Sequence, residues 1–418
     1  MTLEKKIISL AAAAKEASDK IAVSNTDIKN LALIKIAEKI EEKTDYIKEE
    51  NKKDLSDAKK ASLSEAMIDR LTVNDKVIKS MANGLREAAS LEDPVGAITK
   101  TWKRPNGLEV SKMRIPIGVI GIIYESRPNV TIDAAGLCLK SGNAVILRGG
   151  SEAFYSNQAL VKTFKEGLDQ ANLPVNAVQA LGSKNRDAIT ILLKQEEHID
   201  LIIPRGGEGL IRYVVENSKI PVLKHYKGVC HTFIDKTADY QTAEKICLNA
   251  KVQRPGVCNA METMLIHKNI ADTFLPKLHS AFKKEKVELR GCEKTRSILP
   301  EIKPATEEDW YAEYLNLTLA VKTVNNIDEA ISHIKKYGSN HSEAIITQHF
   351  NNARYFIKKV DSSGVFVNAS TRFNDGGELG LGAEIGISTS KLHAFGPMGL
   401  EELTAAKFVI IGNGQIRT

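Results

Sequence analysis

The sequence has no long apolar run, no closely paired cysteines and no arginine-rich block. Its five cysteines are widely spaced and form no C-x-x-C pair, which argues against a disulfide framework and against a structural zinc site. No apolar run approaches the length that spans a membrane. Lysines and glutamates are interleaved, so the formal net charge of +6 lies mostly on solvated surface. Because no basic stripe with interleaved aromatics occurs, the sequence does not indicate nucleic-acid binding.

Targeting signals are also missing from the N-terminal segment. The apolar run after Met1 to Lys6 is short and soon meets Lys15, so it predicts no signal peptide. No arginine precedes Arg70, which speaks against a mitochondrial presequence. Free cysteines suit a reducing compartment, and we expect the protein to be cytoplasmic.

At 418 residues the chain is too long for one ordinary core, and two or three domains are expected. Residues 2 to about 90 repeat apolar positions three and four apart, which predicts a layer of helices. Trp102 to Val110 contains a Pro-Asn-Gly turn between two alternating runs and predicts a hairpin. From Pro116 onward, strand-like and helical runs alternate. This alternation predicts an α/β fold with a parallel sheet covered by helices on both faces.

The strand-like runs of this part are Val119–Ile123, Ala144–Leu147, Ala177–Leu181, Leu201–Ile203 and, more weakly, Pro221–Leu223. Ligands of such sheets bind beyond the carboxyl ends of the strands. Arg148 follows the second run, and Gly206, Gly207 and Gly209 follow the fourth. Free backbone N–H groups at a helix start suit a pyrophosphate, although a glycine-rich turn without the G-x-G-x-x-G pattern is also simply a turn.

The second half of the chain repeats the alternation around Cys258. The charged segment from Glu285 to Thr306 is interpreted as a linker, and its Cys292 as incidental. Residues 368 to 382 lack apolar periodicity and predict a long loop, and loops of that length in a compact enzyme are usually functional or disordered. The apolar tail Phe408–Ile411 predicts a terminal strand that needs a partner, either the hairpin or a second subunit.

Cys258 follows Gln253-Arg254-Pro255-Gly256-Val257 and precedes a strand from Met261 to His267. Proline and glycine end the preceding helix, so the cysteine stands at a tight turn where a substrate can reach it. That is a suitable place for a nucleophilic thiol. The alternative is a small buried apolar residue, which is what most free cysteines are.

Four long stretches resemble the aldehyde dehydrogenase superfamily, and within it the branch that reduces γ-glutamyl phosphate. They are Pro116–Thr131, Lys140–Glu152, Val252–Asn259 and Gly376–Phe408. The resemblance covers nearly the whole chain and implies two Rossmann-like parallel-sheet domains with a small β flap for oligomerisation. The implied NADP-binding domain is residues 1–100 and 117–227, the catalytic domain 228–398, and the flap 101–116 with 399–418.

The resemblance also implies catalytic positions. Cys258 falls at the catalytic thiol, and Asn129 falls at the asparagine whose amide helps form the oxyanion hole. Ser370 to Phe373 fall in the loop that lines the substrate entrance, so Ser370 is a candidate substrate contact. Within that loop Arg372 either grips the substrate's α-carboxylate or lies on the surface. Arg254 lowers the thiol pKa, binds the leaving phosphate, or only caps the preceding helix.

Cofactor positions follow in the same way. Arg148 stands where relatives place a lysine toward the adenosine ribose, and this arginine favours NADPH over NADH. Gly206 and Gly207 take the place of a Gly-Ser pair near the pyrophosphate. Glu313 occupies the position of a glutamate that contacts the nicotinamide ribose. No metal is implied.

One departure from the superfamily bears on the reaction. Hydrolytic members carry a glutamate that activates water, whereas the corresponding run here, His225–Cys230, has no carboxylate. The resemblance therefore implies NADPH-dependent reduction of γ-glutamyl 5-phosphate to glutamate 5-semialdehyde through a Cys258 thioester, a step of proline biosynthesis. Implied partners are a second copy of the chain and the upstream glutamate kinase. Alternatives are a CoA-acylating dehydrogenase and a non-enzymatic protein that kept the fold.

Overall fold

The computed structural model describes residues 1–417, and the chain divides into two compact units. The first unit is residues 1–224, 380–386 and 398–418, and the second is residues 225–379 and 387–397. None of the helices within residues 1–417 combines the length and the apolar character that crossing a bilayer demands.

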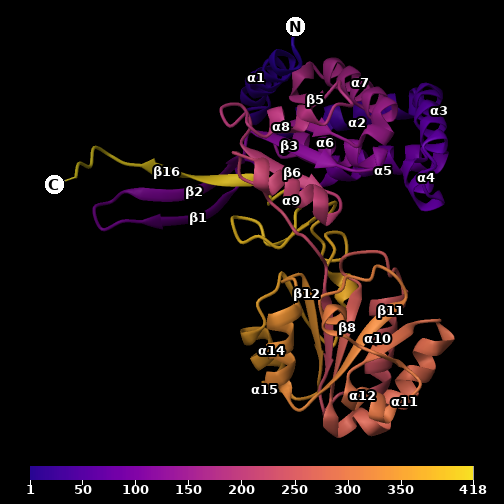
Figure 1. Ribbon diagram of the computed structural model, residues 1–418. Helices are drawn as coiled ribbons and strands as arrows, with labels where there is room; N and C mark the ends of the chain where they lie inside the picture. Colours follow the sequence, from indigo (N-terminus) through magenta and orange to yellow (C-terminus); the bar gives the residue numbers. More distant parts are fainter. Residues whose placement is uncertain (418) are drawn as a thin grey trace. The chain divides into compact units, whose positions relative to one another are not determined.

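The first unit contains a four-stranded parallel sheet of order β5-β4-β3-β6 (Figure 1). Its strands are β3 (Val119–Tyr124), β4 (Ala144–Arg148), β5 (Val178–Ala180) and β6 (Leu201–Arg205). Its helices are α1 (Leu3–Ala22), α2 (Thr26–Glu42), α3 (Thr44–Lys60), α4 (Glu65–Leu71), α5 (Asp75–Ser90), α6 (Pro128–Lys140), α7 (Phe154–Gln170), α8 (Asp187–Leu192) and α9 (Glu208–Asn217). Short 3-10 turns lie at Ser151–Ala153 and Val175–Ala177.

Chain order explains how this sheet is covered. Strands β3, β4 and β5 advance in one direction across the sheet, and β6 returns to the other side of β3. Because parallel crossovers are right-handed, α6 and α7 cover one face and α8 lies on the opposite face. The topological switch point falls between β3 and β6, which is where such sheets bind ligands. The weak run Pro221–Leu223 contributes only an isolated bridge from Val222 to Ile202, so the prediction of a fifth strand was wrong.

A separate three-stranded antiparallel sheet, hereafter the flap, also belongs to the first unit. It consists of β1 (Ile98–Lys103), β2 (Glu109–Pro116) and β16 (Thr404–Ile411), with β2 in the centre. The predicted hairpin and terminal strand are therefore confirmed, and the hairpin is a partner of that strand. Figure 1 shows the flap extending away from the helices of its unit.

The second unit is built on a seven-stranded parallel sheet of order β10-β9-β11-β8-β7-β12-β13. The strands are β7 (Cys230–Ile234), β8 (Met261–His267), β9 (Glu288–Gly291), β10 (Lys303–Pro304), β11 (Thr318–Val324), β12 (Ser342–Ile346) and β13 (Gly364–Val367). The helices are α10 (Tyr240–Val252), α11 (Lys268–Lys284), α12 (Glu293–Ile298), α13 (Glu307–Trp310), α14 (Ile327–Tyr337) and α15 (Phe350–Lys359). A 3-10 turn spans Thr371–Phe373, and a small ladder joins β14 (Ile387–Ser388) to β15 (Gly396–Pro397).

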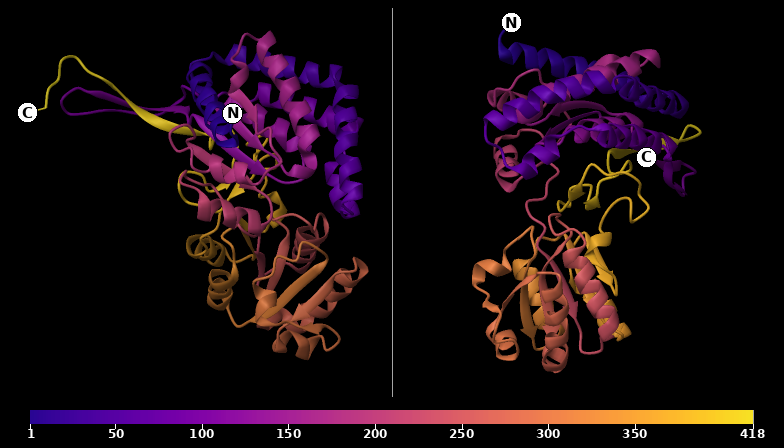
Figure 2. Two further views of the ribbon diagram at one scale, coloured as in Figure 1. Left: turned by 45° about the horizontal axis from the view of Figure 1, so that its top comes forward. Right: turned by 90° about the vertical axis from the view of Figure 1, so that its right-hand side faces the viewer.

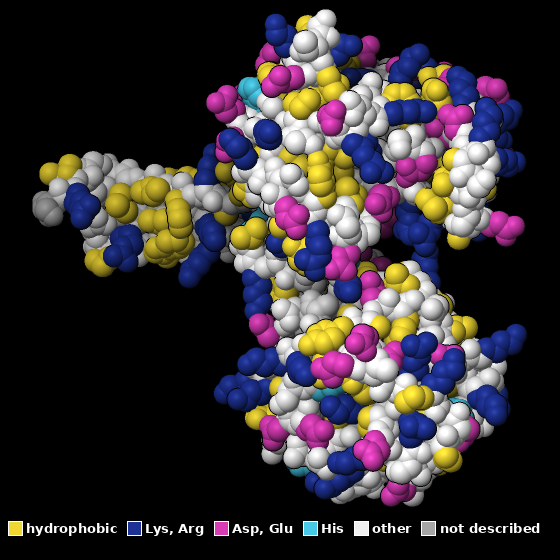
Figure 3. Space-filling model, viewed as in Figure 1, with side chains coloured by type: hydrophobic (Ala, Val, Ile, Leu, Met, Phe, Trp, Pro, Cys, Tyr) yellow, Lys and Arg dark blue, Asp and Glu magenta, His cyan; other side chains and the backbone are white. Residues whose placement is uncertain are grey.

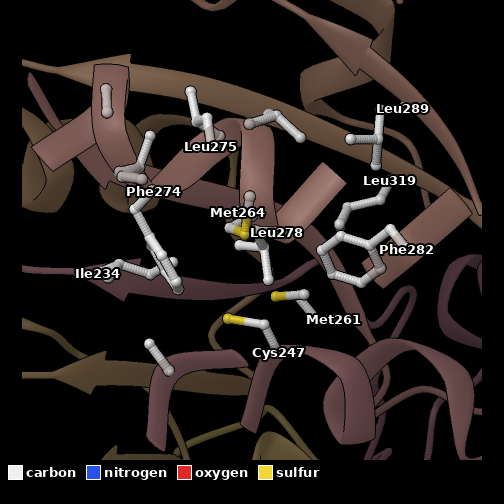
Figure 4. Packing of buried hydrophobic residues seen from close by; sticks show 14 of the residues in the cluster. Ile234, Cys247, Met261, Met264, Phe274, Leu275, Leu278, Phe282, Leu289 and Leu319 are labelled. Atoms are coloured by element: carbon white, nitrogen blue, oxygen red, sulfur yellow. The ribbon is translucent and has the colours of Figure 1, made fainter. Parts of the chain in front are cut away.

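Figure 2 shows the sheet of the second unit between helices, and two apolar clusters hold it there. The larger cluster, seen in Figure 4, packs Phe274, Leu278 and Phe282 of α11 against Met264 of β8 and Leu319 of β11. The smaller one packs residues of α14 and α15 against β7, β8, β11 and β12. The predicted fold class, α/β with two parallel-sheet bodies and a small β flap, is confirmed.

One prediction about this unit was wrong. The segment Glu285–Thr306, interpreted as a linker, supplies β9, α12 and β10 to the sheet. Its strand Glu288–Gly291 alternates polar and apolar residues near the sheet edge, and a short charged strand of this kind does not resemble a core strand.

Candidate active site

The Cys258 turn, residues 253–260, lies at the amino end of β8. Helix α10 ends at Val252 and β8 begins at Met261, so the turn sits before its strand rather than after it. The segments that precede β7 and β11 reach the same edge of the parallel sheet, because β7 and β11 are the two neighbours of β8. The candidate site of this unit therefore lies at the amino ends of the strands. Parallel sheets ordinarily bind their ligands at the opposite, carboxyl ends of the strands.

Exposure separates Cys258 from most of the other cysteines. Cys138, Cys230 and Cys247 are buried, whereas Cys258 and Cys292 are partly exposed. Burial raises the pKa of the three buried thiols, which keeps them protonated. Cys292 is the N-cap residue of α12, and its Sγ lies 3.3 Å from Thr295 Oγ1. Cys258 therefore combines accessibility with a turn between a helix and a strand, as a nucleophile requires.

The segment that leads into β7 contacts the backbone of Cys258 at its carbonyl group. Gly228 approaches it so closely that a Cβ added there would lie 1.9 Å from the Cys258 carbonyl oxygen. The buried Cys230 thiol donates to the same carbonyl oxygen at 3.1 Å. The N–H of Gly228 donates to Glu313 Oε1 at 2.9 Å. The Cys258 turn and the predicted cofactor carboxylate Glu313 are therefore joined through one glycine.

Arg372 holds the turn from the other side. Its Nε donates to Gln253 Oε1 at 2.8 Å, and its guanidinium also donates to Asn259 Oδ1, so it bonds to both flanks of Cys258. Asn259 Nδ2 in turn donates to the carbonyl of Asn374, two residues beyond Arg372, at 3.1 Å. Ser370 is buried, and its Oγ accepts from the Arg372 N–H at 3.3 Å, so it caps the 3-10 turn Thr371–Phe373.

The electrostatics at the turn depend on arginine. Partial burial lowers the pKa of Arg372, and the positive charge of Arg254 lowers it further, while Asp375 and the Cys258 thiolate raise it. Both guanidinium groups are thus close enough to interact, and Arg372 interacts with the thiol. A positive side chain close to a thiol favours its thiolate form.

At the switch point of the first unit, Gly207 is the N-cap of α9. Its N–H donates to Glu125 Oε2 at 2.9 Å, and Glu125 follows β3 directly. An added Cβ on Gly206 would lie 2.5 Å from the same carboxylate oxygen. A carboxylate therefore occupies the helix start, which shows that this backbone accepts an anion.

Arg148 ends β4 with only 8% of its surface exposed. One of its terminal nitrogens donates to the Gly149 carbonyl at 2.6 Å, and its buried Nε finds no hydrogen-bond partner within the described residues. Burial lowers the pKa of Arg148. A buried guanidinium that keeps an unused donor is a plain candidate for an anionic ligand.

Asn129 lies in the first turn of α6 and is partly exposed. Its Nδ2 donates to Asp133 Oδ2 at 3.1 Å. Burial raises the pKa of Asp133 to about 6, and the bond from Asn129 opposes that rise. The side chain of Asn129 is thus oriented by a neighbour one helical turn away.

The predicted site residues divide between the units. Arg148, Gly206, Gly207 and Asn129 belong to the first unit, and Cys258, Arg254, Glu313, Ser370 and Arg372 to the second. Sequence reasoning missed the roles of Gly228, Cys230 and Glu125, although all three lie in stretches it had singled out. Among residues 1–417 no cluster of three or more His, Cys, Asp or Glu side chains could hold a metal ion.

Residues 2–309 match the sequence model of the aldehyde dehydrogenase family, and the chain belongs to that family. It is accordingly an oxidoreductase of a family that uses a nicotinamide cofactor. Within the family, the chain is 58% identical over 417 residues to a γ-glutamyl phosphate reductase of Geotalea daltonii, with all of both chains covered. It is 57% identical over 417 residues to one of Thermodesulfovibrio yellowstonii, again with full coverage.

A solved structure is also similar to the chain over nearly its whole length. The crystal structure of γ-glutamyl phosphate reductase from Thermotoga maritima matches with a TM-score of 0.97 and 47% identity. The match covers 99% of this chain and 100% of that one. An acetylating aldehyde dehydrogenase from Geobacillus thermoglucosidasius matches at 14% identity with a TM-score of 0.69, which is a likeness of fold alone.

Proposed function

We propose that the protein reduces L-γ-glutamyl 5-phosphate to L-glutamate 5-semialdehyde with NADPH and releases phosphate, the second step of proline biosynthesis from glutamate. The observation that carries this proposal is the full-length similarity to γ-glutamyl phosphate reductases at 58% identity. The partly exposed Cys258, held between Gly228 and Arg372, supplies the chemical group that such a reaction needs.

The reaction begins at the thiol. The Cys258 thiolate attacks the γ-acyl carbon, the bond to the phosphate oxygen breaks, and phosphate leaves with that electron pair. Arg254 and Arg372 are assigned to substrate anions, with Arg254 serving the departing phosphate and Arg372 the α-carboxylate or the same phosphate. The backbone N–H of Cys258 and the side chain of Asn129 are assigned to the oxyanion, where losing one donor typically costs about 100- to 1000-fold in rate.

The cofactor residues fit a phosphorylated dinucleotide. Gly206 and Gly207 would receive its pyrophosphate at the start of α9, where Glu125 already places an anion. Arg148 would direct its unused donor to the adenosine end, and a guanidinium there favours the 2′-phosphate of NADPH. Glu313 would hold the nicotinamide ribose. Bound NADPH supplies the hydride that reduces the thioester carbon, after which collapse of the thiohemiacetal frees Cys258 and releases the semialdehyde.

Phosphate acts as the acyl acceptor in the reverse direction because the run His225–Cys230 offers no carboxylate to activate water. His225 instead faces His341 with ring centroids 5.8 Å apart, and burial lowers the pKa of His341 to about 3. A thioester that water does not cleave survives until phosphate arrives.

The decisive assay supplies purified protein with NADP+ and glutamate semialdehyde, with and without inorganic phosphate. NADPH formation that depends on phosphate supports the proposal. Equal rates without phosphate contradict it, and reduction that appears only with CoA indicates a CoA-acylating dehydrogenase instead.

We also propose that the protein is cytoplasmic and associates with a second copy of itself through the flap. Phe408, Ile410 and Ile411 on β16 are more than half exposed, and apolar side chains gather along the flap in Figure 3. Apolar surface of this kind marks an interface between chains. Sedimentation at micromolar concentration should show a dimer or larger assembly, and co-sedimentation with the upstream glutamate kinase tests that partner.

A further inference from the structure

Two fully buried charged residues enclose the Cys258 turn. Lys251 lies near the end of α10 and Glu262 lies in β8, seven residues before and four residues after the cysteine. Both side chains have zero exposure, and Lys251 Nζ donates to Glu262 Oε2 at 2.5 Å. Neither side chain takes part in the catalytic steps assigned to Cys258, Asn129, Arg254 and Arg372.

The second oxygen of Glu262 has its own partner. Oε1 accepts the backbone N–H of Leu315 at 3.1 Å. Leu315 stands at a φ of 54°, in the left-handed region that a leucine rarely adopts, and its side chain is 46% exposed. The bond to Glu262 therefore holds a backbone conformation that is unfavourable for leucine.

Leu315 is two residues beyond Glu313. Glu313 in turn accepts the N–H of Gly228, and Gly228 packs on the Cys258 carbonyl. The contacts therefore close a ring: from the turn that carries the nucleophile, through Glu262, Leu315 and Glu313, back to the nucleophile's own backbone.

We propose that Lys251 and Glu262 are positioning residues, which set the segment of Glu313 against the Cys258 turn through the Glu262–Leu315 bond. This inference rests on the proposed reductase function, because it assigns Glu313 to the cofactor. Stability does not explain the pair, since replacing a buried ion pair by apolar residues is often neutral or stabilising. An apolar residue at position 262, however, cannot accept the Leu315 N–H.

Two double variants separate the bond from the charges. Lys251→Met with Glu262→Leu removes both charges and the acceptor. Lys251→Met with Glu262→Gln also removes the charges but keeps an amide oxygen for Leu315. Melting temperature, kcat, the KM for NADPH and the rate of Cys258 alkylation by iodoacetamide are measured for both variants and the unmodified protein.

We expect the leucine variant to melt within a few degrees of the unmodified protein, while its kcat falls at least tenfold and its KM for NADPH rises, because displacements near 1 Å cost up to about 100-fold. The glutamine variant should recover most of that loss. A leucine variant that keeps its melting temperature and its kcat within twofold overturns the proposal, and so does a glutamine variant that recovers nothing.

Amide hydrogen exchange of the unmodified protein gives a test that needs neither folding of a variant nor turnover. The Leu315 amide should exchange much more slowly than the exposed loop amides around it. Exchange at the rate of a free loop overturns the proposal. Because alkylation and exchange do not depend on the reductase reaction, failure of this inference and failure of the proposed function give different results.

Discussion

Replacing Gly228 with alanine tests whether the segment before β7 positions the nucleophile. The new Cβ would lie 1.9 Å from the oxygen, 2.6 Å from the carbon and 2.7 Å from the Cα of Cys258. Side-chain carbons do not approach such atoms closer than 3.0 Å, so the two backbones must separate by about 1 Å. Overpacking of this kind costs roughly 1–3 kcal/mol of stability, and a 1 Å displacement of a reacting group costs about 100-fold in rate.

The assay is phosphate-dependent NADP+ reduction, measured together with the alkylation rate of Cys258 and the melting temperature. Gly256→Ala is the matched control, because Gly256 lies in the Cys258 turn and its nearest atom to an added Cβ is 3.7 Å away. We expect Gly228→Ala to lower kcat by about 100-fold and Gly256→Ala to change it little. Equal activity of the two variants would refute the reasoning.

Substitutions at four further residues probe other parts of the account. Cys258→Ala should abolish turnover and leave NADPH binding intact; loss of both in titration by fluorescence would show that the thiol is misassigned. Arg372→Gln removes a positive charge that interacts with the thiol and should slow alkylation of Cys258 about tenfold, since a nearby opposite charge lowers the pKa of an acidic group by about one unit or more. Arg372→Lys keeps the charge and should slow alkylation less; an unchanged rate in Arg372→Gln counts against the electrostatic role. Glu125→Gln removes the carboxylate bound at the Gly207 N–H and should tighten NADPH binding about two- to fivefold, the effect of 0.3–1 kcal/mol at a helix start; calorimetry that finds weaker binding contradicts a pyrophosphate there. Burial lowers the pKa of His333 to about 2, so the ring is neutral in the fold and takes up a proton when the chain unfolds below its ordinary pKa of about 6.5. The free energy of unfolding should therefore decrease as the pH falls, by about 1.4 kcal/mol between pH 7.5 and pH 5.5 for this group. Urea unfolding of His333→Leu should show a pH dependence that is smaller by that amount.

The larger features of the fold could be predicted because they depend on periodicity. Apolar runs predicted the four strands of the first sheet and β8 of the second, and the Pro-Asn-Gly turn predicted the hairpin of the flap. The segment Glu285–Thr306 was misjudged because its strand Glu288–Gly291 is short and polar on alternate positions. What decides its structure is pairing with β11, a contact between residues about 30 positions apart.

For the candidate site too, local sequence features could be predicted and long-range contacts could not. The position of Cys258 at an accessible turn could be predicted from Pro255-Gly256 and the strand that follows. The contacts that hold it could not, because Gly228 and Arg372 come from segments 30 and 114 residues away and meet the turn only in the folded unit. Ser370 was predicted as a substrate contact, and the structure places its hydroxyl as a cap of the turn that carries Arg372.

The most direct test of the central claim is mass spectrometry of the protein mixed with NADP+ and glutamate semialdehyde in the absence of phosphate. The account predicts that a γ-glutamyl group accumulates on the peptide containing Cys258 and disappears when inorganic phosphate is added. An unmodified Cys258 together with continued NADPH formation would contradict it, because the acyl group would then be passing to water.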